Sequence, residues 1–239
     1  MSGFYGFGPR GYYMFDWTYL LVIAGLVLSL AAQAGVKNTF ARYSRVRSMS
    51  GLTGAAAAQR VLHAAGIYDV SIARVSGNLT DHYDPRSKTL RLSDSTYGSN
   101  SVAAVCVAAH ECGHAIQDQV KYGPLVLRST LVPAANFGST LSWPVFIAGL
   151  IFSIRPLVSL GILLFSLAVL FQLVTLPVEI NASTRAMRVL RDTHILGDTE
   201  AEGGKKVLRA AALTYVAGLA ASILQLLRLI ILAGGRDRD

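Results

Sequence analysis

The sequence predicts a mainly α-helical integral membrane protein, with about four transmembrane helices and a small cytoplasmic α+β part. Composition is the first reason: of 239 residues, 52% are hydrophobic and only 15% are charged, and the mean hydropathy is +0.44. An ordinary soluble domain is less apolar than this. The second reason is that long apolar segments alternate with segments rich in Lys and Arg, as positive-inside topology requires. The same distribution explains the net charge of +8, so we expect no nucleic-acid binding.

Residues 1–36 are predicted to form an N-terminal tail and the first membrane anchor. Residues 1–17 are rich in Gly and aromatic side chains and are typical of a weakly ordered tail. Residues 18–36 are continuously apolar and long enough to span a membrane. Ala32-Gln33-Ala34 resembles a signal-peptide cleavage site, but the cations follow the apolar segment, which favours an uncleaved anchor with its N-terminus outside. These cations are Lys37, Arg42, Arg45 and Arg47.

Residues 37–130 are predicted to form the cytoplasmic part. It begins with a short amphipathic helix, which has Thr53 near its start and Gly66 as its C-terminal stop. Three strand-like runs joined by turn sequences follow this helix and predict a small antiparallel sheet. The runs cover residues 70–75, 79–83 and 89–92.

Asp81, His82 and Asp84 lie in this sheet region and could be interpreted as an additional metal site. Turn chemistry and a solvent-facing strand account for these three residues equally well. We therefore assign them no role from the sequence.

Directly after the sheet, residues 101–117 predict a buried helix. Ser99, Asn100 and Ser101 are good N-cap candidates, and the apolar residues that follow are not confined to one face. Two residues in this run, Cys106 and Cys112, are six apart on the helix and face different directions, so we expect buried free thiols.

Residues 110–114 of the same helix have the sequence H-E-C-G-H. Its polar residues are His110, Glu111 and His114, and they lie within an otherwise apolar run. Residues four apart on a helix lie one above the other, so both imidazoles point the same way. Two imidazoles can bind zinc, and the adjacent glutamate can activate a water for hydrolysis, as in the H-E-x-x-H motif of metallopeptidases. The alternative is a pair of core histidines that are hydrogen-bonded to the backbone.

A third zinc ligand has to come from elsewhere in the chain. The metzincin extension would need Gly and His where this sequence has Gln117 and Val120, so that subclass is excluded. A carboxylate further along the chain is the expected ligand.

Residues 131–178 are predicted to form a transmembrane hairpin. Its first half, residues 132–154, contains two prolines and can span only as an irregular or partly sheltered helix. Arg155-Pro156 is predicted to be a tight turn, and residues 157–178 are a cleaner span. The hairpin returns the chain to the face that carries the metal helix.

Residues 179–210 are predicted to be a cytoplasmic helical segment that supplies the third zinc ligand, and Glu179 is the residue we favour. Glu179 follows an apolar span directly, where a carboxylate is costly unless something positive meets it. Pro177 is suited to opening a new helix there. A surface glutamate paired with Arg185 is the alternative. The other downstream acids lie in a polar, Gly-containing stretch that is typical of an exposed loop; they are Asp192, Asp198, Glu200 and Glu202.

Residues 211–239 are predicted to be the last transmembrane helix and a tail. Arg228 interrupts this apolar run, but it is near enough to the end of the span to reach the interface.

With these motifs in place, the chain resembles the YugP-like bacterial membrane neutral zinc metallopeptidases, over residues 18–230. More distantly it is similar to the gluzincin group of CAAX prenyl proteases and heat-shock membrane proteases. The segments that carry the resemblance are D-H-Y-D-P-R-S-K at residues 81–88, residues 102–117, P-V-E-I-N-A-S at residues 177–183 and A-A-A-L-T-Y at residues 210–215.

The resemblance implies a zincin-like catalytic part with one Zn²⁺ per chain, held by His110, His114 and a downstream glutamate. It implies that the protein is a metalloendopeptidase with Glu111 as its general base. It also implies a multi-pass protein of the cell membrane whose catalytic face is in the cytoplasm. The substrate would be a peptide or a membrane protein. Spacing singles out no oxyanion-stabilising residue; His194 and Tyr215 are our candidates.

A zinc-binding membrane scaffold and a transporter are the two alternative classes of protein. A membrane scaffold that only binds zinc would not need Glu111, so the presence of this residue favours an enzyme. A transporter would need polar residues at the middle of several spans. Here the cations in the spans lie near their ends, at Arg155 and Arg228.

Overall fold

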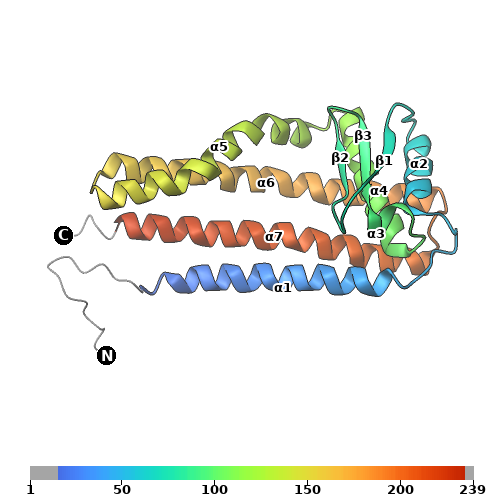
Figure 1. Ribbon diagram of the computed structural model, residues 1–239, viewed down its shortest axis with the longest axis horizontal. Helices are drawn as coiled ribbons and strands as arrows, with labels where there is room; N and C mark the ends of the chain where they lie inside the picture. The colour runs from blue at the N-terminus through green and yellow to red at the C-terminus, as the bar shows by residue number, and fades with distance from the viewer. Residues whose placement is uncertain (1–15, 235–239) are drawn as a thin grey trace.

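The computed structural model describes residues 16–234 of the chain, and the predicted tail of residues 1–15 lies outside this range. Four long helices run along the longest axis of the molecule, and a small α+β part lies at one end of them (Figure 1). Each of the four is long and apolar enough to cross a membrane, which confirms the predicted number of spans among the described residues. They are α1 (Tyr19–Tyr43), α5 (Gly123–Ile151), α6 (Arg155–Asp192) and α7 (Asp198–Gly234).

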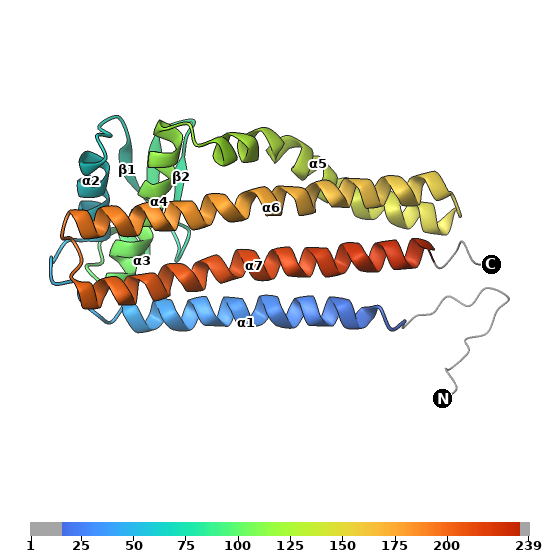
Figure 2. The ribbon, with the colours of Figure 1, turned by 180° about the vertical axis from the view of Figure 1, so that it is seen from behind.

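The helices extend beyond the segments that the sequence predicts to span. The helix α6 continues through Pro177 instead of ending before it, so no new helix opens there. Neighbouring helices stabilise a proline-containing helix in an apolar environment. The helix α5 likewise keeps Pro133 and Pro144 inside one element, and it bends along its course (Figure 2). The tight turn of the hairpin comes before Arg155, at residues 152–154, where Ser153 has a φ of 56°.

The small part contains the helices α2 (Gly54–Ala64), α3 (Asp94–Tyr97) and α4 (Val102–Gln119). The capping residues are those that the sequence predicts. Thr53 Oγ1 accepts a hydrogen bond from the Ala56 N–H, and Ser101 Oγ accepts one from the Ala104 N–H. Gly66 has a φ of 74°, which is the left-handed conformation of a helix stop.

The sheet is mixed, so the prediction of a purely antiparallel sheet is wrong. Its strands are β1 (Ser71–Val75), β2 (His82–Asp84) and β3 (Thr89–Ser93), in the order β1-β3-β2. The strands β1 and β3 are parallel, whereas β2 and β3 form an antiparallel hairpin. The loop between β1 and β2 therefore passes over β3, and hydrogen bonds hold this loop against the end of β3. In this loop the Gly77 N–H donates to Asp94, and Asp81 accepts from the Ser93 N–H.

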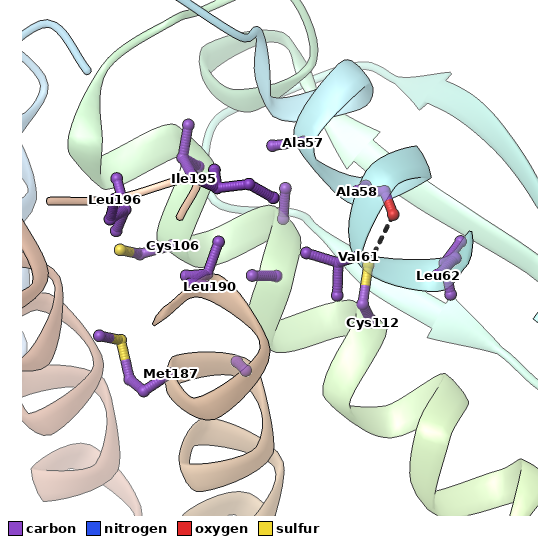
Figure 3. Packing of buried hydrophobic residues seen from close by; sticks show 14 of the residues in the cluster. Ala57, Ala58, Val61, Leu62, Cys106, Cys112, Met187, Leu190, Ile195 and Leu196 are labelled. Carbon is purple, nitrogen blue, oxygen red and sulfur yellow. Dashed lines mark hydrogen bonds between the residues drawn. The ribbon is translucent and has the colours of Figure 1, made fainter. Parts of the chain in front are cut away.

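A buried core holds α2, α4 and the end of α6 together (Figure 3). Both cysteines lie in it as free thiols, as the sequence predicts, and the Cys112 thiol donates to the Ala58 carbonyl oxygen at 3.5 Å. Burial raises the pKa of Cys106 to about 12, so this thiol stays protonated at neutral pH.

A glycine lets α4 and α6 approach closely at the level of the histidines. A Cβ on Gly113 would lie 2.4 Å from the carbonyl oxygen of Ala182. Real Cβ atoms are essentially never so close to another atom, so only Gly fits this position. The contact sets the distance between the histidines on α4 and Glu179 on α6.

Arg228 does not reach the interface by extending toward water, because the residue is only 9% exposed. Its Nε donates to Thr18 Oγ1 at 3.2 Å, and its guanidinium lies 4.1 Å from the centre of the Tyr19 ring. Arg228 Nη2 also lies 4.0 Å from Asp16 Oδ2, so an ion pair inside the protein joins the end of α7 to the start of α1.

Candidate metal centre

The two histidines of α4 are oriented by hydrogen bonds at their Nδ1 atoms. His110 Nδ1 lies 3.0 Å from Ser183 Oγ, and His114 Nδ1 lies 3.0 Å from Gln117 Oε1. Gln117 uses its amide nitrogen elsewhere, as donor to the Val178 carbonyl oxygen at 2.8 Å, so its oxygen accepts from the His114 Nδ1–H. The lone pair of His114 is therefore at Nε2, the atom that faces Glu179.

Glu179 on α6 completes the cluster. Its Oε2 lies 3.3 Å from His110 Nε2 and 3.6 Å from His114 Nε2. The three possible ligand atoms, one from each of these residues, thus lie within 4.8 Å of one another. Four ligands placed tetrahedrally around zinc at about 2.1 Å are about 3.4 Å apart, so the donor set and its spacing fit this ion.

A buried atom without a partner supports the same assignment. Glu179 is only 3% exposed, and its Oε2 has no hydrogen-bond partner among residues 16–234. A buried polar atom that lacks a hydrogen-bond partner costs about 1–3 kcal/mol. A divalent cation between Glu179 and the two histidines would remove this cost.

The charge partner of Glu179 is not the one that the sequence alternative names. Arg185 Nε donates to Asn181 Oδ1 at 2.7 Å. The cation beside Glu179 is Arg128 of α5, whose nitrogen lies 3.7 Å from Oε1. Nothing in the local sequence singles out Arg128, which is 51 residues before Glu179 and reaches it only because α5 and α6 pack together.

Glu111 lies on α4 between the two histidines and is 8% exposed. It lines the same cavity as His110, His114 and Glu179. Burial alone would lower the pKa of His114, but its close approach to the Glu179 carboxylate and the negative charges of Glu111 and Glu179 outweigh burial, so this pKa lies above its ordinary value. The site therefore concentrates negative charge, which favours a bound cation.

The cavity over the cluster has a volume of about 700 Å³. The edge strand β2, the helix α4 and the first turns of α5 form its walls, to which Lys121 and Arg128 contribute positive charge. Tyr83 on β2 donates to Asp118 on α4 at 2.9 Å and joins the strand to the metal helix. The cluster is thus open to a ligand of considerable size.

The two candidates for oxyanion stabilisation have different places in the structure. Tyr215 of α7 lines the cavity and lies within electrostatic range of Glu179 and Glu111. His194 is exposed in the turn between α6 and α7 and does not line the cavity. The helix α6 carries it about 20 Å past Glu179, so the structure argues against the His194 candidate.

Asp81, His82 and Asp84 have partners within the sheet region. Asp81 accepts from Ser93, the ring of His82 contacts the Thr80 carbonyl oxygen, and Asp84 pairs with Arg91 at 3.0 Å. Turn and strand structure therefore accounts for all three. Asp81 and His82 nevertheless line the cavity at the edge of β2.

The other downstream acids are not all in an exposed loop, because α7 begins at Asp198. Glu200 is 8% exposed and accepts hydrogen bonds from the N–H groups of Met49 and Gly197. It caps two chain segments and has a structural role. Glu202 remains exposed and pairs with Lys205 at 2.5 Å.

Gln117 belongs to the site, although the sequence analysis gave it no role there. It is fully buried and connects His114 to the backbone of α6 at Val178 and to Asn181. Its position three residues after His114 on a buried helix was the available signal, since residues three apart share a helix face.

Comparison with known proteins gives a consistent result. The family model described as "Putative neutral zinc metallopeptidase" matches residues 18–234. A curated relative, "Putative membrane protease YugP" from Bacillus subtilis (strain 168), is 48% identical over 220 residues, which cover 92% of this chain and 98% of the relative. No solved structure was found to match the chain.

Proposed function

The chain belongs to the "Putative neutral zinc metallopeptidase" family, and on this basis we propose that it hydrolyses peptide bonds as a membrane-bound zinc metalloendopeptidase. The observation that carries the proposal is the cluster of His110, His114 and Glu179, with Glu111 beside it in an open cavity. A zinc ion held by the three residues would supply a Lewis acid for the scissile carbonyl and acidify a water.

Glu111 has the position of a general base. It is part of the same cavity wall as the three ligands, and a carboxylate there can take a proton from the attacking water. The same carboxylate can then deliver that proton to the leaving amine. Tyr215 lines the same cavity, and its proposed role is to donate a hydrogen bond to the carbonyl oxygen of the substrate as negative charge develops on this oxygen.

The edge strand β2 provides a binding surface for the substrate backbone. One side of β2 pairs with β3, and its residues line the cavity next to the metal cluster. An extended peptide could bind there by strand addition, with backbone hydrogen bonds supplying affinity. A peptide or a membrane protein is therefore the substrate class we propose.

The lipid bilayer is the second partner in this proposal. The basic segments after α1 and around the α6–α7 turn lie at the end that carries the small α+β part (Figure 1). By the positive-inside rule we propose that the catalytic face is in the cytoplasm, and that the start of α1 and the end of α7 lie on the opposite side of the cell membrane.

A zinc-binding membrane scaffold without activity is the alternative function. Structural zinc sites are usually closed by four protein ligands, whereas catalytic sites keep one position open. The described chain offers three ligands to the cluster and a cavity of about 700 Å³ beside them, which favours the enzyme.

Substitution of Glu111 tests the proposal directly. In purified protein, Glu111→Gln should retain about one zinc per chain and lose casein hydrolysis by on the order of 10²–10⁴-fold, because a base is removed but no ligand. Glu202→Gln, an equal change at an exposed site, serves as the matched control. Undiminished turnover by Glu111→Gln would refute the mechanism.

A further inference from the structure

A second cavity of about 240 Å³ adjoins the metal cluster on its other side. It shares Asp81, His110, Glu111, Glu179 and Tyr215 with the larger cavity, so the two meet at the cluster. The larger cavity extends toward α5, whereas the smaller one extends between α1, α4 and α7. A chain that crossed the cluster would therefore enter one cavity on each side.

The walls of the smaller cavity are mainly apolar beyond the cluster. Away from the metal cluster, two polar lining groups already have partners: Thr214 Oγ1 donates to the Ala211 carbonyl oxygen at 2.6 Å, and Asp81 accepts from Ser93. Water in such a space would find few partners, so an apolar group is the favoured occupant. The apolar wall includes Val36, Phe40, Leu79, Val107, Ala211 and Ala212.

The size of this cavity suits one side chain. Small-molecule sites usually measure about 300–1,000 Å³, and a water molecule occupies about 30 Å³ in the liquid. A volume of about 240 Å³ is sufficient for one large apolar side chain, such as that of leucine, methionine or phenylalanine. Ala211 and Ala212 are small residues on the α7 wall, so a larger side chain at either position would fill part of the cavity.

The course of the chain at β2 connects the two cavities. Leu79, which comes before β2, lines the smaller cavity, whereas His82 and Tyr83 of β2 line the larger one. A peptide that extends along this edge passes over the cluster from one cavity to the other. Its side chains alternate in direction, so one of them next to the scissile bond can enter the smaller cavity.

We infer that the cavity between α1, α4 and α7 is a specificity pocket for a large apolar side chain adjacent to the cleaved bond. This inference rests on the proposed function. A lipid acyl chain is the other apolar occupant to consider. Glu111 and Glu179 line both cavities, so polar groups lie where the pocket meets the larger cavity. This favours a peptide, whose polar backbone can lie there while the apolar side chain enters the pocket.

The test uses the purified full-length zinc-loaded protein and casein, with cleaved bonds mapped by mass spectrometry. One side of the cleaved bonds should be enriched in Leu, Met and Phe. Ala211→Phe, which fills the pocket, should lower this enrichment by about tenfold and favour small residues. Val107→Ala, which enlarges it, should shift the preference to larger side chains. Leu213→Phe is the control, on the same helix but 51% exposed.

The readouts separate failure of the pocket from failure of the proposed function. Cleavage that depends on Glu111 but shows no apolar preference, or a preference that neither pocket variant changes, overturns the pocket. Absence of cleavage that depends on Glu111 overturns the proposed function, and the pocket assignment with it. Zinc content near one per chain in Ala211→Phe shows that this variant keeps its fold. Phospholipid retained by the parent protein and lost from Ala211→Phe, without a change in preference, would assign the pocket to lipid.

Discussion

Replacement of Gly113 by alanine should separate the zinc ligands without changing any of them. The new Cβ would lie 2.4 Å from the Ala182 carbonyl oxygen, and ordinary contacts begin at 3.4 Å. The helices α4 and α6 would therefore have to separate by about 1 Å, because the obstructing atom belongs to the α6 backbone. Glu179 is three residues before Ala182 on α6, so its carboxylate would move away from His110 and His114.

The magnitude follows from these distances. The separation of Glu179 Oε2 from His110 Nε2 is 3.3 Å, and metal–ligand distances tolerate changes of only about 0.2 Å. We expect zinc affinity to fall by about 10–100-fold, comparable to loss of a residue that orients a ligand. Overpacking of this kind also destabilises the folded state by about 1–3 kcal/mol, which outweighs the roughly 1 kcal/mol that Ala gains over Gly in a helix.

The assay is zinc competition with a chromophoric chelator, combined with thermal unfolding in detergent. Gly35→Ala is the matched control: Gly35 is also a helical glycine, and a Cβ there would meet no atom within 4 Å. The control should bind zinc like the parent and be equally stable or slightly more stable. If Gly113→Ala binds zinc with parental affinity, the close approach of α4 and α6 does not set the ligand distances.

Three further predictions concern the ligands, the oxyanion and the topology. Glu179→Ala should lose zinc and hydrolysis together, while Glu202→Ala keeps both, as atomic absorption and casein assays can check; parental zinc binding by Glu179→Ala would refute the ligand assignment. Tyr215→Phe should keep zinc and lower kcat by about 10–1,000-fold, whereas His194→Ala should leave both unchanged; equal rates for Tyr215→Phe and the parent would remove Tyr215 from the mechanism. Met49 is 86% exposed, so the cysteine of Met49→Cys should react with an impermeant thiol reagent only in inverted vesicles. The two native thiols are buried and should not react. Labelling in intact cells would show that the proposed topology is inverted.

The labelling position follows from the structure. Ser48 lies in the basic segment after the first span and would be the obvious position for cysteine labelling from the sequence. Ser48 is only 6% exposed, and its hydroxyl contacts Ser50 at 2.9 Å, so a cysteine there would be shielded from either side of the membrane. Met49 is the adequate replacement.

The sequence by itself determined the elements whose signals are local. Four apolar segments predict four spans, because length and hydropathy suffice for that inference. Ser101 followed by an apolar run predicts the buried helix α4, and a spacing of four residues puts His110 and His114 on one face of it. The return of a hairpin to the same side of the membrane predicts that Glu179 approaches them, and the structure brings the three together.

Tertiary structure decided the features that depend on contacts between distant segments. The order β1-β3-β2 is set by how a loop packs on the end of β3, and strand propensity carries no information about it. Arg128 reaches Glu179 only because α5 packs on α6, and Glu200 is buried because it caps Met49 from 151 residues away. His194 is excluded from the site by the rigid length of α6. Local periodicity fixes which face of an element is buried, but the packing of whole elements fixes which partner meets that face.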